Sequence, residues 1–120
     1  MGMTHVTATV RASTKAKRKY EALFLVDTGA MDCMAPAARL RKIGLVKRDR
    51  VAYELADGRT AEYDVGFAEV EFMGGVVPAR VIFGPDNCEP ILGVTALEMS
   101  GITVDPATQT LKRLPAIPLK

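Results

Sequence analysis

The sequence has few of the residues from which common functional sites are built. It contains one histidine and two cysteines, and it has no Cys-x-x-Cys pair. Because zinc sites depend on histidine and cysteine ligands, no metal site is expected, and the widely separated Cys33 and Cys88 are predicted to be free thiols. A Ser-His-Asp triad would have to join His5 to Ser13 or Ser100, and neither serine lies in a recognisable nucleophile turn. Zinc enzymes and serine hydrolases are therefore disfavoured.

The chain also lacks a long hydrophobic run and a strong charge imbalance. No apolar stretch approaches the length that crosses a bilayer, and the N-terminus lacks the basic-then-apolar pattern of a signal peptide. The 16 Lys and Arg residues against 14 Asp and Glu give a net charge of +2, which is no general argument for nucleic-acid or membrane binding. We expect a cytoplasmic protein with no membrane partner.

Length and composition indicate one domain. The 120 residues, of which 48% are hydrophobic, suffice to bury a core. They leave no room for a second catalytic lobe, and no internal repeat or low-complexity tract is present. We therefore expect residues 1–120 to form a single domain.

The most informative stretch is an apolar run that ends in an acidic residue, a hydroxyl and a glycine, Ala22-Leu23-Phe24-Leu25-Val26-Asp27-Thr28-Gly29-Ala30. Consecutive apolar residues bounded by turn formers predict a strand covered on both faces, and a carboxylate at its end is costly unless something uses or satisfies it. Our first interpretation is that Asp27 has a functional role. The alternative is that Asp27 merely caps a turn, with Gly29 supplying conformational freedom.

A second motif follows about sixty residues later, Pro90-Ile91-Leu92-Gly93-Val94-Thr95-Ala96-Leu97, and the combination is far rarer than either part. At this point the chain resembles the retropepsin-like aspartic proteases, the single-domain family that includes the retroviral proteases. The resemblance rests on Glu21-Ala22-Leu23, on Asp27-Thr28-Gly29-Ala30, on a central hairpin and on Ile91-Leu92-Gly93, and it covers about residues 6–105.

Hydrophobic patterns and turn signals predict a mainly β fold. Strands are expected at residues 6–12, 20–26, 51–55, 60–65, 67–72, 76–83, 102–104 and 110–114. A short helix is expected at 36–43, and a second one is expected to end at Met99-Ser100-Gly101. The resemblance implies that these strands close into a barrel of the acid-protease type, an all-β domain with one or two short helices that is active as a symmetric homodimer.

The central hairpin turns at Ala56-Asp57-Gly58-Arg59, because Asp-Gly between alternating segments is among the strongest hairpin signals. In the resemblance this hairpin is the flap that covers substrate; the alternative is an ordinary surface hairpin. Retroviral flap tips are rich in glycine and apolar residues. Here a single Gly58 lies between Asp57 and Arg59, so substrate contacts at the tip are expected to differ.

The resemblance implies aspartic endopeptidase activity on a peptide or protein substrate. The chain has one Asp-Thr-Gly, so a homodimer must supply the second carboxylate. Two Asp27 side chains at contact distance cannot both ionise and should share a proton. One carboxyl then acts as the acid while its mate is the base that activates water. No cofactor, metal or covalent intermediate is required.

The resemblance also assigns roles around Asp27. Thr28 would bond across the dimer axis, and Gly29 would allow backbone contact with substrate. Ala30 stands where two-lobed enzymes often carry a hydroxyl residue, so a weakly acidic pH optimum is expected. The cleft would be completed by a further set of residues, which suggests apolar pockets with acidic rims: Asp32, Met34, Ala56, Asp57, Gly58, Cys88, Glu89 and Ile91.

The sequence departs from the retroviral pattern at two places. First, Met31 and Val94 stand in place of an ion pair, so the dimer is expected to be held differently or more weakly. Second, only residues 1–5 precede the first expected strand, so the dimer sheet is expected to be a C-terminal hairpin at about 101–114. The main alternative function is a catalytically silent peptide-binding or dimerisation module. The basic loops at 15–19 and 39–50 are expected to be solvated surface, and nucleic acid is not an expected partner.

Overall fold

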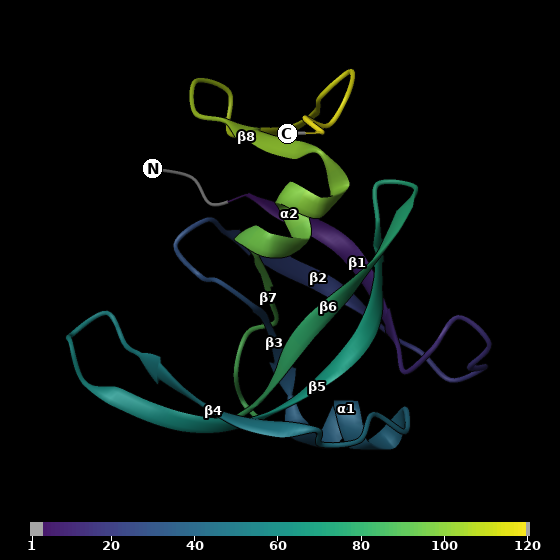
Figure 1. The fold of residues 1–120 in the computed structure, drawn as a ribbon, viewed down its shortest axis with the longest axis vertical. Helices are drawn as coiled ribbons and strands as arrows, with labels where there is room; N and C mark the ends of the chain where they lie inside the picture. Colours follow the sequence, from purple (N-terminus) through teal and green to yellow (C-terminus); the bar gives the residue numbers. More distant parts are fainter. Residues whose placement is uncertain (1–3, 120) are drawn as a thin grey trace.

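The computed structural model describes residues 4–119. Figure 1 shows strands wrapped around a central space, with the two helices at opposite ends of the molecule. The elements, in chain order, are β1 (His5–Arg11), β2 (Tyr20–Asp27), β3 (Cys33–Pro36), α1 (Ala37–Lys42), β4 (Asp49–Glu54), β5 (Thr60–Phe72), β6 (Gly75–Gly84), β7 (Ile91–Gly93), α2 (Val94–Ser100), β8 (Ile102–Asp105) and β9 (Thr110–Arg113).

Seven strands form one sheet that closes on itself. Their order is β1-β2-β7-β3-β6-β5-β4, and a further pairing of β1 with β5 joins the two sides of the sheet. The β2–β7 and β3–β6 pairs are parallel, and the remaining pairs are antiparallel. The predicted mainly β barrel with two short helices is confirmed.

Strand β5 is longer than the sequence patterns indicate. Segments 60–65 and 67–72, predicted as separate strands, form one strand of 13 residues that continues through Gly66. Its first half pairs with β4, and its second half pairs with β6 and β1. A Cβ at Gly66 would lie 2.8 Å from the carbonyl oxygen of Val46, so the close approach of the 45–46 segment explains the glycine.

The core lies inside the barrel and under both helices. Phe24 of β2 and Leu92 of β7 are fully buried, as are Leu40 of α1 and Leu97 of α2. Pro36 precedes α1 and cannot donate a backbone hydrogen bond, which suits the start of a helix. The expected helix at 36–43 is therefore found with slightly narrower bounds, while the short strand β3 before it was not predicted.

The C-terminal strands β8 and β9 form a separate two-stranded sheet beside α2, as expected for a hairpin (Figure 1). Helix α2 ends at Gly101, whose φ of 69° lies in the left-handed region that favours glycine. The hydroxyl of Thr4 donates to the Gln109 carbonyl at 2.7 Å, which fixes the hairpin against the start of β1.

Neither cysteine is in a disulfide, in agreement with the predicted free thiols. Cys33, the first residue of β3, is buried, and this burial raises the pKa of its thiol to about 11. Within residues 4–119, no helix is long and apolar enough to cross a membrane.

Candidate active site

Asp27 is the last residue of β2, at the point where the strand leaves the sheet. In the parallel β2–β7 pair it lies opposite Gly93. The chain then turns tightly: the Ala30 N–H donates to the Asp27 carbonyl at 3.1 Å, and the Gly29 N–H donates to the Asp27 Oδ1 atom at 2.9 Å. The carboxylate orientation is therefore fixed by its own loop, which pre-positions it for chemistry and satisfies one of its acceptor sites.

Two residues of the second sequence motif, Val94 and Thr95, form hydrogen bonds with the loop that follows Asp27. The Val94 N–H donates to the Ala30 carbonyl at 2.8 Å, and the Thr95 hydroxyl donates to the Met31 carbonyl at 2.7 Å. A Cβ at Gly93 would lie 2.4 Å from the Asp32 carbonyl oxygen, so only glycine allows the two segments to approach. The two motifs are thus parts of one structural unit.

A cleft of about 690 Å³ opens above Asp27, a volume typical of ligand sites. Its walls come from residues 27–32, which we call the Asp27 loop, from β4 and the two residues after it, and from residues of β3, β5, β6 and β7. The lining residues are Asp27, Gly29, Ala30, Met31, Asp32, Met34, Tyr53, Glu54, Leu55, Ala56, Tyr63, Ile82 and Ile91. Most of them are apolar or aromatic.

One side of the cleft is a β-hairpin, which we call the flap hairpin: β4, the turn at residues 55–59 and residues 60–65 of β5. It projects from the barrel to the lower left in Figure 1. Because side chains alternate along a strand, the two faces of the hairpin differ. Tyr53 and Tyr63 are half-buried on the inner face, with their ring centroids 6.2 Å apart.

Asp32 is the one charged side chain among residues 4–119 that is buried, with 6% of the residue exposed. Its Oδ2 atom accepts a hydrogen bond from the Tyr53 hydroxyl at 2.7 Å and another from the Arg80 Nε–H at 2.8 Å. We call these three residues the inner cluster. It joins the Asp27 loop to the flap hairpin and to β6, and it supplies the partners that a buried carboxylate requires.

The inner cluster also shifts the pKa values of its members. Burial, followed by the hydrogen bond to Asp32, raises the pKa of Tyr53, so this hydroxyl stays protonated as a donor. The same carboxylate raises the pKa of Arg80. The Asp32 carboxylate is thus engaged by two donors and is not a free acidic group in the cleft.

Of the comparisons with known proteins, the one with solved structures gives matches. No protein-family model and no curated protein matches the sequence. Among solved structures, the chain is similar to the retroviral protease-like domain of Ddi1 from Leishmania major, with a TM-score of 0.58 and 18% identity over 97% of this chain and 91% of that one.

The fold is retropepsin-like. This conclusion agrees with the resemblance seen in the sequence, and at 18% identity it concerns the fold alone. The closed mixed sheet with two short helices is consistent with this fold.

Within this retropepsin-like fold, the predicted site residues separate into two groups. Those that line the cleft are Asp27, Gly29, Ala30, Asp32, Met34, Ala56 and Ile91. Those that do not line it in the single chain are Thr28, Asp57, Gly58, Cys88 and Glu89. The roles of both groups remain predictions.

The residues outside the cleft have other surroundings. Thr28 is exposed directly beside Asp27. Asp57 accepts hydrogen bonds from the Arg59 backbone N–H and from the Arg59 Nε–H within the flap turn. Glu89 pairs with His5 at 3.0 Å on the surface. The acidic rim expected from Asp57 and Glu89 is therefore absent from the cleft lining of the single chain.

Sequence reasoning missed several cleft residues, namely Met31, Tyr53, Glu54, Leu55, Tyr63 and Ile82. The alternation along residues 49–54 was the available signal for Tyr53, because every second residue there faces inward. No local motif marks Ile82, whose place in the lining depends on the pairing of β3 with β6.

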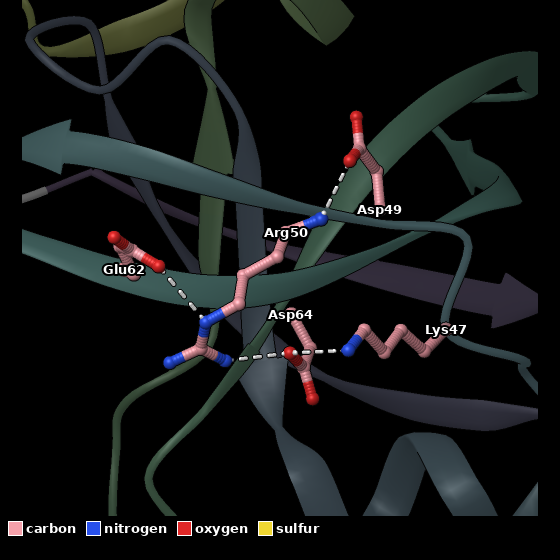
Figure 2. Close-up of polar contacts among 5 residues, drawn as sticks. All are labelled: Lys47, Asp49, Arg50, Glu62 and Asp64. Carbon is pink, nitrogen blue, oxygen red and sulfur yellow. Dashed lines mark hydrogen bonds and ion pairs between the residues drawn. The ribbon is translucent and has the colours of Figure 1, made fainter.

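The outer face of the flap hairpin carries a different polar group, shown in Figure 2. Arg50 donates from Nη1 to Asp64, which is its cross-strand partner, at 2.7 Å, and from Nε to Glu62 at 3.1 Å. Lys47 lies 3.4 Å from the same Asp64 carboxylate. We call these four residues the outer cluster, and all of its ion pairs are open to solvent.

No group of three or more His, Cys, Asp or Glu residues within the described chain is arranged to hold a metal ion.

Proposed function

We propose that this protein is an aspartic endopeptidase that hydrolyses peptide bonds as a homodimer. The observation that carries the proposal is a fixed carboxylate, Asp27, at the end of a buried strand and in the wall of a cleft of about 690 Å³. The retropepsin-like fold supports it, and the presence of one Asp-Thr-Gly in the chain requires a second subunit.

In the proposed reaction, two Asp27 side chains face each other across a two-fold axis and share one proton, because like charges at contact distance raise one pKa. The ionised carboxylate removes a proton from a water held between them. The water oxygen attacks the peptide carbonyl, while the protonated partner donates to the developing oxyanion. Collapse of the intermediate breaks the C–N bond: the carboxyl that took the proton from water protonates the leaving nitrogen, the other carboxylate takes back the hydroxyl proton, and the pair again holds one proton.

The cleft lining supports a preference for extended peptides with apolar side chains near the cut. Met31, Met34 and Ile82 provide apolar surface, and Tyr53 and Tyr63 add aromatic surface from the flap hairpin. Because Asp32 is already engaged by Tyr53 and Arg80, we do not expect it to select basic side chains.

We propose that the C-terminal hairpin contributes to the dimer. Its two strands pair only with each other within the described chain, so their outer edges are available for pairing with a second copy. Removal of everything after Pro106 takes away β9 and should yield monomers in sedimentation experiments. A truncated chain that remains dimeric would contradict this assignment.

The decisive experiment is digestion of a diverse peptide mixture between pH 3 and pH 8, a range that brackets a carboxyl dyad. Wild type and Asp27→Asn are compared by mass spectrometry. We expect cuts between apolar residues, strongest at weakly acidic pH, that disappear in Asp27→Asn. A pH profile that is flat from strongly acidic to neutral conditions would contradict the dyad assignment.

The second candidate is a peptide-binding module in which the flap hairpin and cleft hold an extended segment without cutting it. The intact Asp27-Thr28-Gly29 motif favours the enzyme. If wild type and Asp27→Asn give the same products while both stay folded and dimeric, the catalytic proposal is wrong, and the same peptide mixture should then be screened for retention by the protein.

A further inference from the structure

Most of the described basic side chains fall into two groups; Arg48, Lys112 and Arg113 belong to neither. Those of the first group each have a carboxylate oxygen within 4.0 Å: Arg11, Lys47, Arg50, Arg59 and Arg80. Those of the second group have no carboxylate partner within residues 4–119, and they gather where the β1–β2 loop meets α1: Lys15, Lys17, Arg18, Lys19, Arg39, Arg41 and Lys42. Like charges are thus concentrated at one end of the barrel although the net charge is only +2.

A cavity of about 240 Å³ lies within this second group. We call it the basic cavity, and it is lined by Arg18, Lys19, Tyr20, Arg39, Lys42 and Ile43. Arg39 and Lys42 are three residues apart on α1 and therefore share one face of the helix. Arg18 and Lys19 reach the same space from the end of the β1–β2 loop.

The Arg18 guanidinium is held in place. It donates from Nη1 to the Lys42 carbonyl, at the C-terminal end of α1, at 3.0 Å. The following Gly44 has a φ of +86°, and a Cβ there would lie 3.3 Å from Arg18 Nη2, so the glycine leaves room for the guanidinium. The remaining N–H groups of this fixed fork are available to an acceptor in the basic cavity.

The floor of the basic cavity is less polar than its walls. Ile43 is buried, and Tyr20 packs its ring against Phe24 with centroids 6.1 Å apart. Burial raises the pKa of Tyr20, whereas the charge of Arg39 lowers it, so the hydroxyl remains a hydrogen-bond donor at neutral pH. Asp86, an acidic group packed against α1, bonds to the Ala38 N–H at the other end of the helix.

We propose that the basic cavity binds the phosphate group of inorganic phosphate or of a phosphate monoester. Two arginines and two lysines line the cavity, no acidic residue lines it, and guanidinium forks match phosphate oxygens in geometry and charge. A volume of about 240 Å³ suits a compact anion with a small body rather than a long polymer. The site lies outside the Asp27 cleft and does not depend on protease activity.

The test measures binding of inorganic phosphate and pyrophosphate by calorimetry and by thermal unfolding, with sodium chloride at matched ionic strength as the reference. A ligand that binds the folded state raises the unfolding temperature with concentration. We expect saturable stabilisation of wild type. The double variant Arg39→Gln/Lys42→Gln should bind at least about tenfold more weakly, because it loses two charge-assisted contacts.

The matched control is Lys15→Gln/Lys17→Gln, which removes the same charge from the same basic end but outside the basic cavity. We expect this control to bind phosphate within about twofold of wild type. In dilute chloride, the cavity variant should unfold at a higher temperature than wild type, because fewer like charges face each other. This measurement also establishes that the variant is folded.

Several outcomes would overturn the proposal: no stabilisation by phosphate beyond chloride, or equal weakening by the cavity and control variants. Salt-sensitive binding of a DNA duplex that both variants weaken equally, without phosphate binding, would indicate a nucleic-acid surface instead.

Binding of a peptide with one phosphoserine, compared with binding of its unphosphorylated form, distinguishes a phosphorylated protein from a small molecule as the source of the phosphate group. Tighter binding of the phosphopeptide than of free phosphate would support a phosphorylated partner, and the reverse would support a small-molecule ligand.

Discussion

The inner and outer clusters each contain an Arg–Asp ion pair, and the two pairs have different surroundings. The side chain of Asp32 is 5% exposed in the inner cluster, whereas that of Arg50 is 52% exposed in the outer one. A buried charge that loses its partner is strongly destabilising, while exposed ion pairs contribute little and are screened by salt. Burial, rather than the number of ion pairs, therefore decides which cluster matters for folding.

The clusters also differ in what they connect. Arg50 and Asp64 are direct neighbours in the β4–β5 register, so the outer cluster reinforces a pairing that the backbone already makes. The inner cluster joins Asp32, Tyr53 and Arg80, which come from the Asp27 loop, β4 and β6. Only the inner cluster fixes the flap hairpin relative to Asp27.

The largest expected effect comes from Asp32→Ala. It leaves the Arg80 guanidinium and the Tyr53 hydroxyl without their acceptor, and we expect a loss of about 3 kcal/mol in the free energy of unfolding, toward the low end for buried pairs because Arg80 is partly exposed. Urea titration measures the loss. The control is Asp57→Ala in the exposed flap turn, which should change the free energy of unfolding little. An equal loss in both variants would show that burial does not decide the contribution of a carboxylate here.

The next prediction concerns stability at alkaline pH and depends on Cys33, which follows Asp32 in the sequence. Burial, the larger cause, and the nearby Asp32 charge raise the pKa of this thiol from 9.0 to about 11. The folded protein thus keeps the thiol protonated at a pH where the unfolded chain ionises. Below about pH 9 the thiol does not reduce the free energy of unfolding. As the pH rises toward 11, the free energy of unfolding falls by about 2 kcal/mol because of this thiol.

Urea titrations of wild type and Cys33→Ala from pH 8 to pH 11 measure this contribution. We expect a shallower decline in the variant, because the titrating thiol has been removed. Parallel declines would show that Cys33 is not shielded in the folded state.

A smaller effect is expected for Tyr53→Phe, which keeps the ring and removes only the hydroxyl that donates to Asp32. We expect a loss of about 1.5 kcal/mol in unfolding free energy, the lower range for a hydrogen bond to a charged group. In peptide cleavage, KM should rise more than kcat falls, because the flap hairpin is less often closed. Tyr63→Phe is the control, and a matching change in it would contradict the role of Tyr53.

The smallest effect is expected from Arg50→Gln in the outer cluster. The Arg50 side chain lowers the pKa of Asp64, but Arg50 is exposed and Asp64, with 27% of its side chain exposed, is still in contact with solvent. We expect no measurable change of the urea midpoint at physiological salt and a slight decrease at low salt, where screening is weak. A loss comparable to that of Tyr53→Phe would show that exposure does not separate the two clusters.

The sequence predicted the parts of the site that depend on local chemistry. Asp27 at the end of an apolar run, Gly93 in its own motif and the turn at Gly58 each carry a signal in a few adjacent residues. The barrel followed from strand patterns together with the resemblance. These features could be predicted because neighbouring residues determine them.

The inner cluster could not be predicted in the same way. Tyr53 and Arg80 lie 21 and 48 residues from Asp32, and no spacing rule connects them. Their meeting depends on strand pairing: Asp32 and Arg80 directly precede the Cys33–Val81 pair of the parallel β3–β6 strands, and Tyr53 is brought to them by β4, which pairs with β5 beside β6. Strand β3 was missed for a different reason: its four residues, which end at Pro36, carry too little periodicity to separate them from the following helix.

The continuity of β5 has a consequence for how this protein can vary. The flap hairpin and the barrel share one strand, so their side chains alternate in a single phase from Thr60 to Phe72. An insertion of one residue directly after Asp64 would turn Tyr63 outward and Asp64 inward relative to the barrel, exchanging the two faces of this strand of the hairpin. Length changes should therefore be tolerated at residues 56–59, beyond the last β4–β5 pair, and related sequences should differ in length there rather than along the strand.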